Sequence, residues 1–140
     1  MGAGEHLKAT DLSPKSGRAH FNYGMFLLAS GKLDQAAVEF QTALRYKSKH
    51  PEAHYYLGRV FYLKGDLEGA KTQYLEAARL DPKAPVHNSL GVIYMKLGQT
   101  SGAIAEFNEA LRLRPDDADA AENLRFAQQS QAREGLTGPR

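Results

Sequence analysis

The feature that most constrains this chain is a pattern that returns every 33 or 34 residues. Three glycines, Gly24, Gly58 and Gly91, are spaced 34 and 33 residues apart. The same offset relates two alanine positions, an aromatic position between them, a bulky position and a final serine or proline: Ala36, Ala70 and Ala103; Phe40, Tyr74 and Phe107; Ala43, Ala77 and Ala110; Tyr46, Leu80 and Leu113; Ser48, Pro82 and Pro115. A repeat of this length indicates one supersecondary unit that buries its apolar face only against its neighbours.

Each repeat predicts two antiparallel helices. In the second repeat, apolar residues return every three or four positions over about 52–64 and again over 67–80, which is typical of amphipathic helices. Gly58 and Ala70 are expected where the two helices cross, because a larger side chain there would force them apart. Asp66 is placed to cap the second helix. Glycine accepts the left-handed conformation that ends a helix, and one follows each first helix, at Gly31, Gly65 and Gly98.

This pattern resembles the tetratricopeptide repeat, a 34-residue unit with L-G-x-x-Y, A-x-x-x-F, A and P positions. The second repeat matches it with Leu57-Gly58-x-x-Phe61, Ala70-x-x-x-Tyr74, Ala77 and Pro82. The resemblance implies an all-α fold, an α–α superhelix (solenoid) of three helix pairs with a C-terminal capping helix and an N-terminal partial helix. It also implies that most aromatic residues lie in the core, and these are Tyr23, Phe40, Phe61, Tyr74, Tyr94 and Phe107.

The alignment of the repeats gives the predicted boundaries along the chain. They are 1–16 for an N-terminal stub or leader, 17–50, 51–83 and 84–117 for three repeats, 118–133 for a capping helix and 134–140 for a flexible tail. Arg125 stands where the crossing glycine of a further repeat would be, so we expect no second helix to pack there.

The N-terminal 16 residues allow two interpretations. Ala9, Leu12 and Pro14 lie 34 residues before Ala43, Tyr46 and Ser48, which makes this segment either the stub of a preceding repeat helix or a leader with chance matches. If the stub is loose, the apolar face of the first repeat is a candidate surface for self-association.

Composition and motifs give no sign of catalysis. The 18 basic and 16 acidic residues are interspersed, so no basic patch predicts nucleic-acid binding. The chain has no cysteine, and it has no phosphate loop, nucleophile elbow or H-E-x-x-H zinc motif. We therefore expect neither an enzyme nor a cofactor. No apolar run approaches the roughly 20 residues of a membrane span, so we expect a soluble chain without direct membrane insertion, with the cytoplasm slightly favoured.

A histidine recurs in each repeat, at His20, His54 and His87. These residues are expected on successive first helices about 8–10 Å apart, whereas ligands of one zinc ion lie about 2 Å from it. We therefore interpret them as packing or surface-edge residues and expect no metal site. His6 and His50 are expected at a chain end and a turn, with no evident partner.

In tetratricopeptide proteins the first helices line a concave face, and the resemblance implies which residues point into it. The predicted partner-binding residues are Phe21, Asn22, Met25, Tyr55, Arg59, Tyr62, Asn88, Val92 and Met95. The capping helix adds Glu122, Asn123, Phe126 and Gln129. Aromatic, methionine and arginine side chains are enriched at binding hot spots, so we expect this face to hold an extended or helical peptide. The alternative for each residue is ordinary packing between repeats.

Two known chemistries of such faces can be compared with this sequence. Co-chaperones that clamp the carboxylate tails of heat-shock proteins carry lysine, arginine and asparagine at positions that are Phe21, Met25, Tyr56, Asn88 and Val92 here. The clamp is therefore absent. The asparagine ladder of repeat-containing glycosyltransferases is broken at two of its four positions.

Three functions remain as hypotheses. The leading one is a protein-interaction module that binds a peptide or helix of a partner and acts as an adaptor or assembly scaffold. The second is a structural module that forms a homo-oligomer through exposed repeat ends. The third is a regulatory fragment of a larger enzyme or of a longer repeat array.

Overall fold

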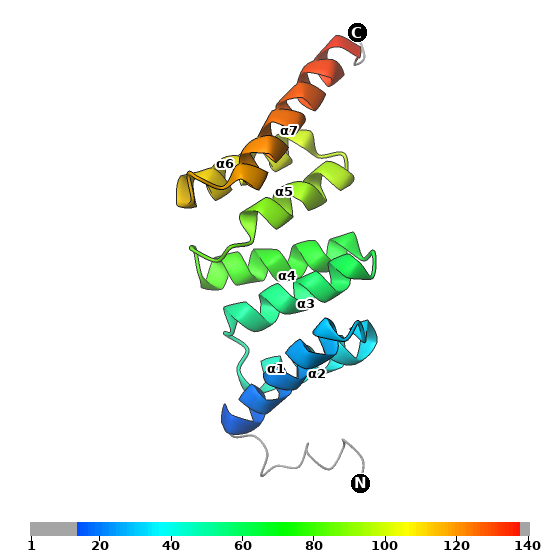
Figure 1. Ribbon diagram of the computed structural model, residues 1–140, viewed down its shortest axis with the longest axis vertical. Helices are drawn as coiled ribbons and strands as arrows, with labels where there is room; N and C mark the ends of the chain where they lie inside the picture. The colour runs from blue at the N-terminus through cyan, green and yellow to red at the C-terminus, as the bar shows by residue number, and fades with distance from the viewer. Residues whose placement is uncertain (1–13, 138–140) are drawn as a thin grey trace. The chain divides into compact units, whose positions relative to one another are not determined.

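The computed structural model describes residues 14–137, which form seven α-helices and no strand (Figure 1). The prediction of an all-α chain is confirmed. In chain order the helices are α1 (Pro14–Ala29), α2 (Leu33–Tyr46), α3 (Pro51–Leu63), α4 (Leu67–Leu80), α5 (His87–Lys96), α6 (Thr100–Leu113) and α7 (Ala118–Thr137). They divide into two compact parts, unit 1 with α1 to α4 and unit 2 with α5 to α7.

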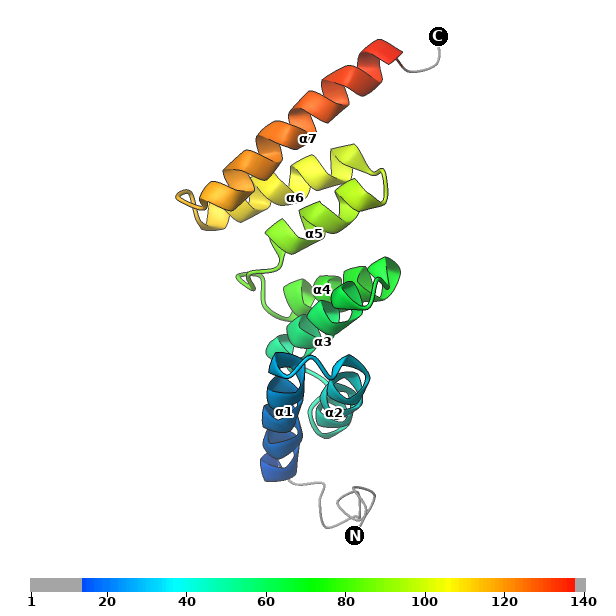
Figure 2. The same cartoon turned by 45° about the vertical axis from the view of Figure 1, so that its right-hand side comes forward.

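Unit 1 consists of two helical hairpins, in which α1 lies against α2 and α3 lies against α4 (Figures 1 and 2). Helix α2 also packs against α3, so the second helix of one hairpin meets the first helix of the next. One apolar core cluster joins α1, α2 and α3. Its buried members are Phe21, Leu27, Ala36, Ala37, Phe40, Ala43, Ala53, Leu57 and Val60.

Each hairpin turn is made by a glycine with positive φ. The φ angles of Gly31, Gly65 and Gly98 are 78°, 86° and 76°, which lie in the left-handed region that glycine enters without steric cost. After Gly65, the backbone N–H of Asp66 donates to the carbonyl of Phe61 over 2.9 Å, as in a Schellman end. The Asp66 carboxylate then accepts the N–H of Gly69 over 2.9 Å. The predicted glycine ends and the Asp66 cap are confirmed.

The helices of each hairpin meet where an aromatic ring lies against a bare glycine. A Cβ atom added at Gly58 would stand 2.9 Å from the Tyr74 ring, and one at Gly91 would stand 2.3 Å from the Phe107 ring. Real Cβ contacts are longer, so only glycine leaves room for the ring. Ala70 is fully buried beside this crossing, as the sequence predicts.

Unit 2 contains one hairpin and a long final helix. Helices α5 and α6 form the hairpin, α7 packs against α6, and α7 also touches α5. The cluster of Ala103, Phe107 and Ala127 forms its core between α6 and α7. At the start of α7, the Asp117 carboxylate accepts the N–H of Ala120 over 3.1 Å and caps the helix.

Helix α7 ends later than the repeat pattern predicts. It runs to Thr137, so the segment predicted as a tail begins inside the helix. The physical reason is that its last turns are held by α6: the Thr100 hydroxyl donates to the Glu134 carboxylate over 2.7 Å, and Gln131 donates to Ser101 over 3.0 Å.

The prediction that Tyr23 lies in the core is wrong. Tyr23 is 52% exposed, because no helix of residues 14–137 covers the side of α1 on which it lies. The predicted N-terminal stub (residues 1–13 of the 1–16 segment) and His6 lie outside the described residues. Among the helices that are described, none is long and apolar enough to cross a membrane.

Candidate functional site

The first helices of unit 1 place four of the predicted binding residues at or near the surface. Asn22 and Arg59 are exposed, while Met25 and Tyr62 are half-buried. Arg59 and Tyr62 are three residues apart on α3 and therefore lie on one side of it. Within residues 14–137 no carboxylate forms an ion pair with Arg59. We call Asn22, Met25, Arg59 and Tyr62 the unit 1 face.

Phe21 belongs to the core and not to an accessible face. It is 8% exposed, and its ring centroid lies 5.7 Å from that of Phe40 and 6.0 Å from that of Tyr56. A partner cannot contact this ring without opening the hairpin. Phe21 therefore supports the unit 1 face from below and is not part of it.

Tyr55 is half-buried between two other tyrosines. Its ring centroid lies 4.9 Å from that of Tyr56 in an edge-on contact and 5.6 Å from that of Tyr74. Tyr56 in turn stacks on Phe40 at 6.2 Å. This chain of rings fixes α3 to both of its neighbours, so Tyr55 serves packing at least as much as binding. Tyr56 supports the site but is not among the nine predicted binding residues. The adjacent tyrosines Tyr55 and Tyr56 are the feature of the sequence that could have indicated it.

The three remaining predicted residues lie on α5 in unit 2. Asn88 accepts a hydrogen bond from the Asn123 amide of α7 over 3.0 Å. Val92 and Met95 are half-buried and pack against the core of unit 2. On α7, Phe126 is 56% exposed. The nine predicted residues thus form two groups, one on each unit.

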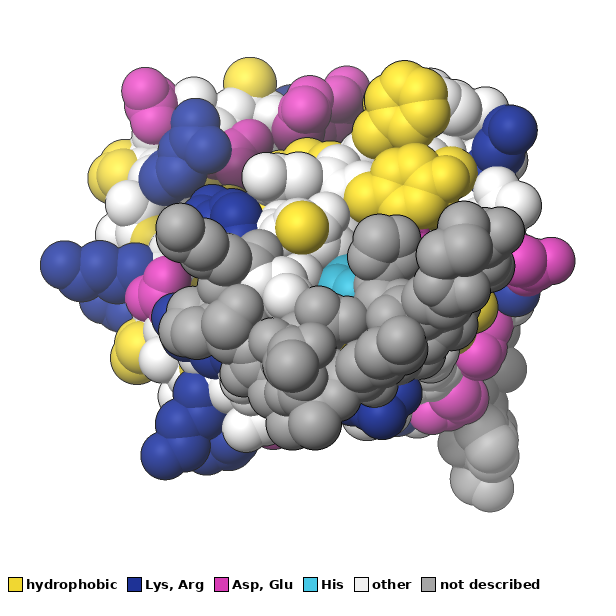
Figure 3. All heavy atoms as spheres, turned by 90° about the horizontal axis from the view of Figure 1, so that it is seen from below, with side chains coloured by type: hydrophobic (Ala, Val, Ile, Leu, Met, Phe, Trp, Pro, Cys, Tyr) yellow, Lys and Arg dark blue, Asp and Glu magenta, His cyan; other side chains and the backbone are white. Residues whose placement is uncertain are grey.

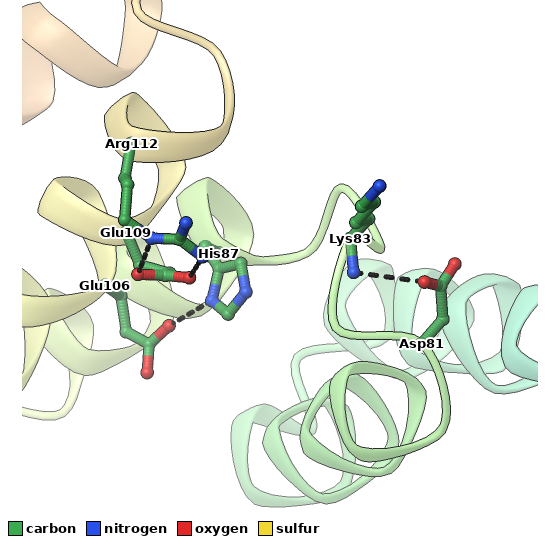
Figure 4. Close-up of polar contacts among 6 residues, drawn as sticks. All are labelled: Asp81, Lys83, His87, Glu106, Glu109 and Arg112. Atoms are coloured by element: carbon green, nitrogen blue, oxygen red, sulfur yellow. Dashed lines mark hydrogen bonds and ion pairs between the residues drawn. The ribbon is translucent and has the colours of Figure 1, made fainter.

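The repeated histidines tie the two helices of each hairpin together. His20, His54 and His87 each direct Nδ1 to a side-chain oxygen 19 residues later, at 2.7 Å in every case. The partners are Glu39, Gln73 and Glu106. Figure 4 shows the His87–Glu106 contact between α5 and α6, together with the Arg112–Glu109 pair on α6 and the Lys83–Asp81 contact before α5. In the described range no group of three or more metal-binding side chains gathers.

His50 has two partners, although the sequence predicts none. It precedes α3, its ring centroid lies 4.9 Å from that of Phe21, and its Nε2 lies 3.6 Å from the Glu52 carboxylate. Burial lowers the pKa of His50 below its ordinary value of 6.5, with Lys47 adding to the shift and Glu52 opposing it. The cause is that a protonated ring loses hydration against Phe21.

This environment predicts an acid-sensitive contribution to stability. Since the pKa of His50 is lower in the folded chain than in the unfolded one, the unfolded chain binds more protons as the pH falls below 6.5. The contribution is therefore present above pH 6.5 and is lost as the pH falls through the lowered folded pKa. We expect His50→Gln to unfold with a shallower pH dependence than the wild type in urea titrations between pH 7.5 and pH 5. Parallel curves for the two proteins would contradict this assignment.

Family models match most of the chain. A model described as a tetratricopeptide repeat matches residues 27–85, and one described as a TPR repeat matches residues 91–131. Among curated relatives, the TPR repeat-containing protein PA4299 of Pseudomonas aeruginosa is 41% identical over 91 residues, which cover 64% of this chain and 37% of the relative. Cell division cycle protein 27 homolog A of Arabidopsis thaliana is 32% identical over 110 residues, 78% of this chain and 15% of the relative. The chain thus spans well under half of the length of these relatives.

Solved structures show the same fold at low sequence identity. The first TPR domain of Spaghetti (RPAP3), bound to an HSP90 peptide, is 16% identical and superposes with a TM-score of 0.82 over 86% of this chain and 96% of that one. The Yersinia enterocolitica type III secretion chaperone SycD, in complex with a peptide of the translocator YopD, is 16% identical with a TM-score of 0.79 over 86% of this chain and 98% of that one. The predicted fold class, an all-α chain of the α–α superhelix type, is confirmed.

Proposed function

Because this chain belongs to the tetratricopeptide repeat family, we propose that it binds a peptide or helix of a partner protein on the unit 1 face and acts as an adaptor or assembly scaffold. Two neighbours of the same fold, RPAP3 and SycD, are named as complexes with peptides of other proteins. The residues that carry the proposal here are Met25 of α1 and Arg59 and Tyr62 of α3.

The single observation that carries this proposal is that Arg59 is exposed and forms no ion pair with the described residues. Two arginines on second helices are already engaged: Arg79 pairs with Glu76 on α4, and Arg112 pairs with Glu109 on α6. Arg59 has no such partner among the described residues, although it lies one turn from a half-buried tyrosine. An arginine has five donors in a fixed fork and binds a carboxylate with two parallel hydrogen bonds.

The other residues of the unit 1 face define the rest of the partner. Met25 is half-buried and packs against the core of unit 1, and it presents a polarisable side chain that adapts to an irregular apolar surface. Tyr62 offers a ring with a hydroxyl group and few rotatable bonds, which is typical of binding anchors. We therefore propose a peptide that sets an acidic side chain near Arg59 and an apolar side chain near Met25 or Tyr62.

This proposal predicts that Arg59→Ala separates binding from stability. Peptides that bind the full chain are selected from a displayed random library, and their affinities are measured by calorimetry. We expect Arg59→Ala to lower affinity by roughly tenfold or more, because a hydrogen bond to a charged group contributes about 1.5–3 kcal/mol. The melting temperature is expected to stay nearly unchanged, since exposed substitutions away from structural contacts change stability little.

Arg79→Ala is the matched control, because Arg79 is also an exposed arginine, on α4, and it pairs with Glu76. It removes the same charge and is expected to leave peptide affinity within about twofold. Selected peptides that bind Arg59→Ala as tightly as the wild type would contradict the proposal. So would peptides whose chemical-shift changes in NMR spectra fall outside α1 and α3. Tyr55→Ala could not replace Arg59→Ala in this test. It would also remove the packing contact between the Tyr55 and Tyr74 rings, so a loss of binding could not be separated from a loss of stability.

A further inference from the structure

Within each unit, one helix packs one side against the second helix that precedes it: α3 packs against α2, and α7 packs against α6. In α3 this side is formed by Ala53, Leu57 and Val60, which are buried. The equivalent residues of α7 are Ala120, Leu124 and Ala127, of which Leu124 is half-buried and the other two are buried. The equivalent residues of α1 are Ala19, Tyr23 and Phe26, and all three are exposed. We call these three residues the outer face of α1.

In α3 and α7, this side packs against the core residues of the preceding second helix. Ala53, Leu57 and Val60 share one core cluster with Ala37 and other residues of α2. In unit 2, Leu124 and Ala127 share a cluster with Ala103 and Phe107 of α6. The outer face of α1 therefore continues a helix-to-helix interface that is present once within each described unit.

The exposed rings on this face are large and already ordered. Tyr23 is 52% exposed and Phe26 is 63% exposed, and their rings stack with centroids 6.4 Å apart and an interplanar angle of 12°. Figure 3 views this end of the chain and shows hydrophobic side chains gathered at one edge of it. A contiguous exposed apolar patch is a candidate interaction surface in a soluble protein.

We propose that the outer face of α1 binds the outer face of α1 in a second copy of this chain, with the two helices antiparallel about a twofold axis near Tyr23. Residue size supports this arrangement. With the axis between positions 22 and 23, Ala19 of one copy lies opposite Phe26 of the other, so the smallest residue meets the most exposed ring. The contact is isologous and closes on itself as a dimer.

Charge also favours the antiparallel pairing. Apart from His20, the charged residues of α1 are Lys15 and Arg18, both basic and both in its first half. The last turn of α1 contains no basic residue, and the carbonyl groups there carry the negative end of the helix dipole. An antiparallel pair keeps the two basic halves of α1 apart, whereas a parallel pair would set them together.

The size of the face sets the expected affinity. A complete aromatic side chain buries about 150–250 Å², and these two rings are about half exposed, so the contact is well below the roughly 800 Å² per partner of a standard interface. We expect a reversible dimer with a dissociation constant between about 1 μM and 1 mM.

The test combines sedimentation equilibrium with a fluorescent probe in the full chain. The chain contains no tryptophan, so Phe26→Trp introduces a single reporter on the outer face. We expect the wild type and Phe26→Trp to dimerise with rising concentration, and the tryptophan emission to shift to shorter wavelength over the same range. Phe26→Glu is expected to raise the dissociation constant by roughly tenfold or more.

Val38→Glu is the matched control, because Val38 is 56% exposed on α2 at a position where the equivalent Thr72 and Ala105 are also exposed. It should dimerise like the wild type. The proposal is overturned if the wild type stays monomeric over the whole concentration range, or if Phe26→Glu dimerises as the wild type does.

The fluorescence of Phe26→Trp separates the two ways in which the chain could stay monomeric. If the indole of a monomer is protected from quenchers at every concentration, the chain itself covers the face and the proposal is overturned. If the indole of a monomer is open to quenchers, the face is uncovered and does not bind a second copy of the chain. A different protein would then be its partner, and the proposal is overturned equally.

Discussion

Gly91→Ala is expected to destabilise unit 2 by about 1–3 kcal/mol, although alanine is the better helix former. The added Cβ would stand 2.3 Å from Cε1 and 2.5 Å from Cδ1 of Phe107. The Phe107 ring is buried at the centre of the core of unit 2 and cannot turn away. Either the ring or the spacing of α5 and α6 must change. Urea denaturation followed by circular dichroism measures the loss.

Gly102→Ala provides the control within the same hairpin. Gly102 lies inside α6, and a Cβ there would meet the Tyr94 ring at an ordinary 3.5 Å. Because glycine in a helix is less favourable than alanine by about 0.5–1 kcal/mol, we expect this variant to be slightly more stable than the wild type. If both variants lose stability equally, the steric explanation for Gly91 is wrong.

Phe40→Ala is expected to remove about 3–5 kcal/mol from the stability of unit 1, the usual range for a buried phenylalanine. Phe40 is fully buried, and its ring contacts those of Phe21 and Tyr56. Its loss leaves a cavity between α1, α2 and α3. A thermal or urea unfolding experiment should show a large shift without a change in helix content of the folded state.

The contact between Phe40 and Gly24 makes this effect testable by a double-mutant cycle. A Cβ at Gly24 would stand 2.8 Å from the Phe40 ring, so Gly24→Ala alone should destabilise. In the Phe40→Ala background the same Cβ has room and fills part of the cavity, so Gly24→Ala should become neutral or stabilising. Additive free energies of unfolding would show that the two positions do not touch.

The candidate site was only partly predictable from the sequence. The repeat pattern identifies which positions belong to first helices, and Asn22, Met25, Arg59 and Tyr62 do lie at or near the surface. It does not distinguish Phe21 from its neighbours, because the direction of that ring depends on Phe40 and Tyr56, which are 19 and 35 residues away. The same limit applies to His50, whose position beside Phe21 follows from how α3 packs on α1 and α2.

The sequence by itself determined the local structure of this protein. The 34-residue spacing, the glycines at positive φ and the glycine–aromatic crossings depend on residue size and backbone freedom, which are properties of single positions. Tertiary structure decided which equivalent residues are covered. Leu57 and Tyr23 occupy the same repeat position, yet Leu57 is buried against α2 while Tyr23 is half exposed. Burial depends on whether another helix lies alongside, and the residue type at that position does not determine whether such a helix is present.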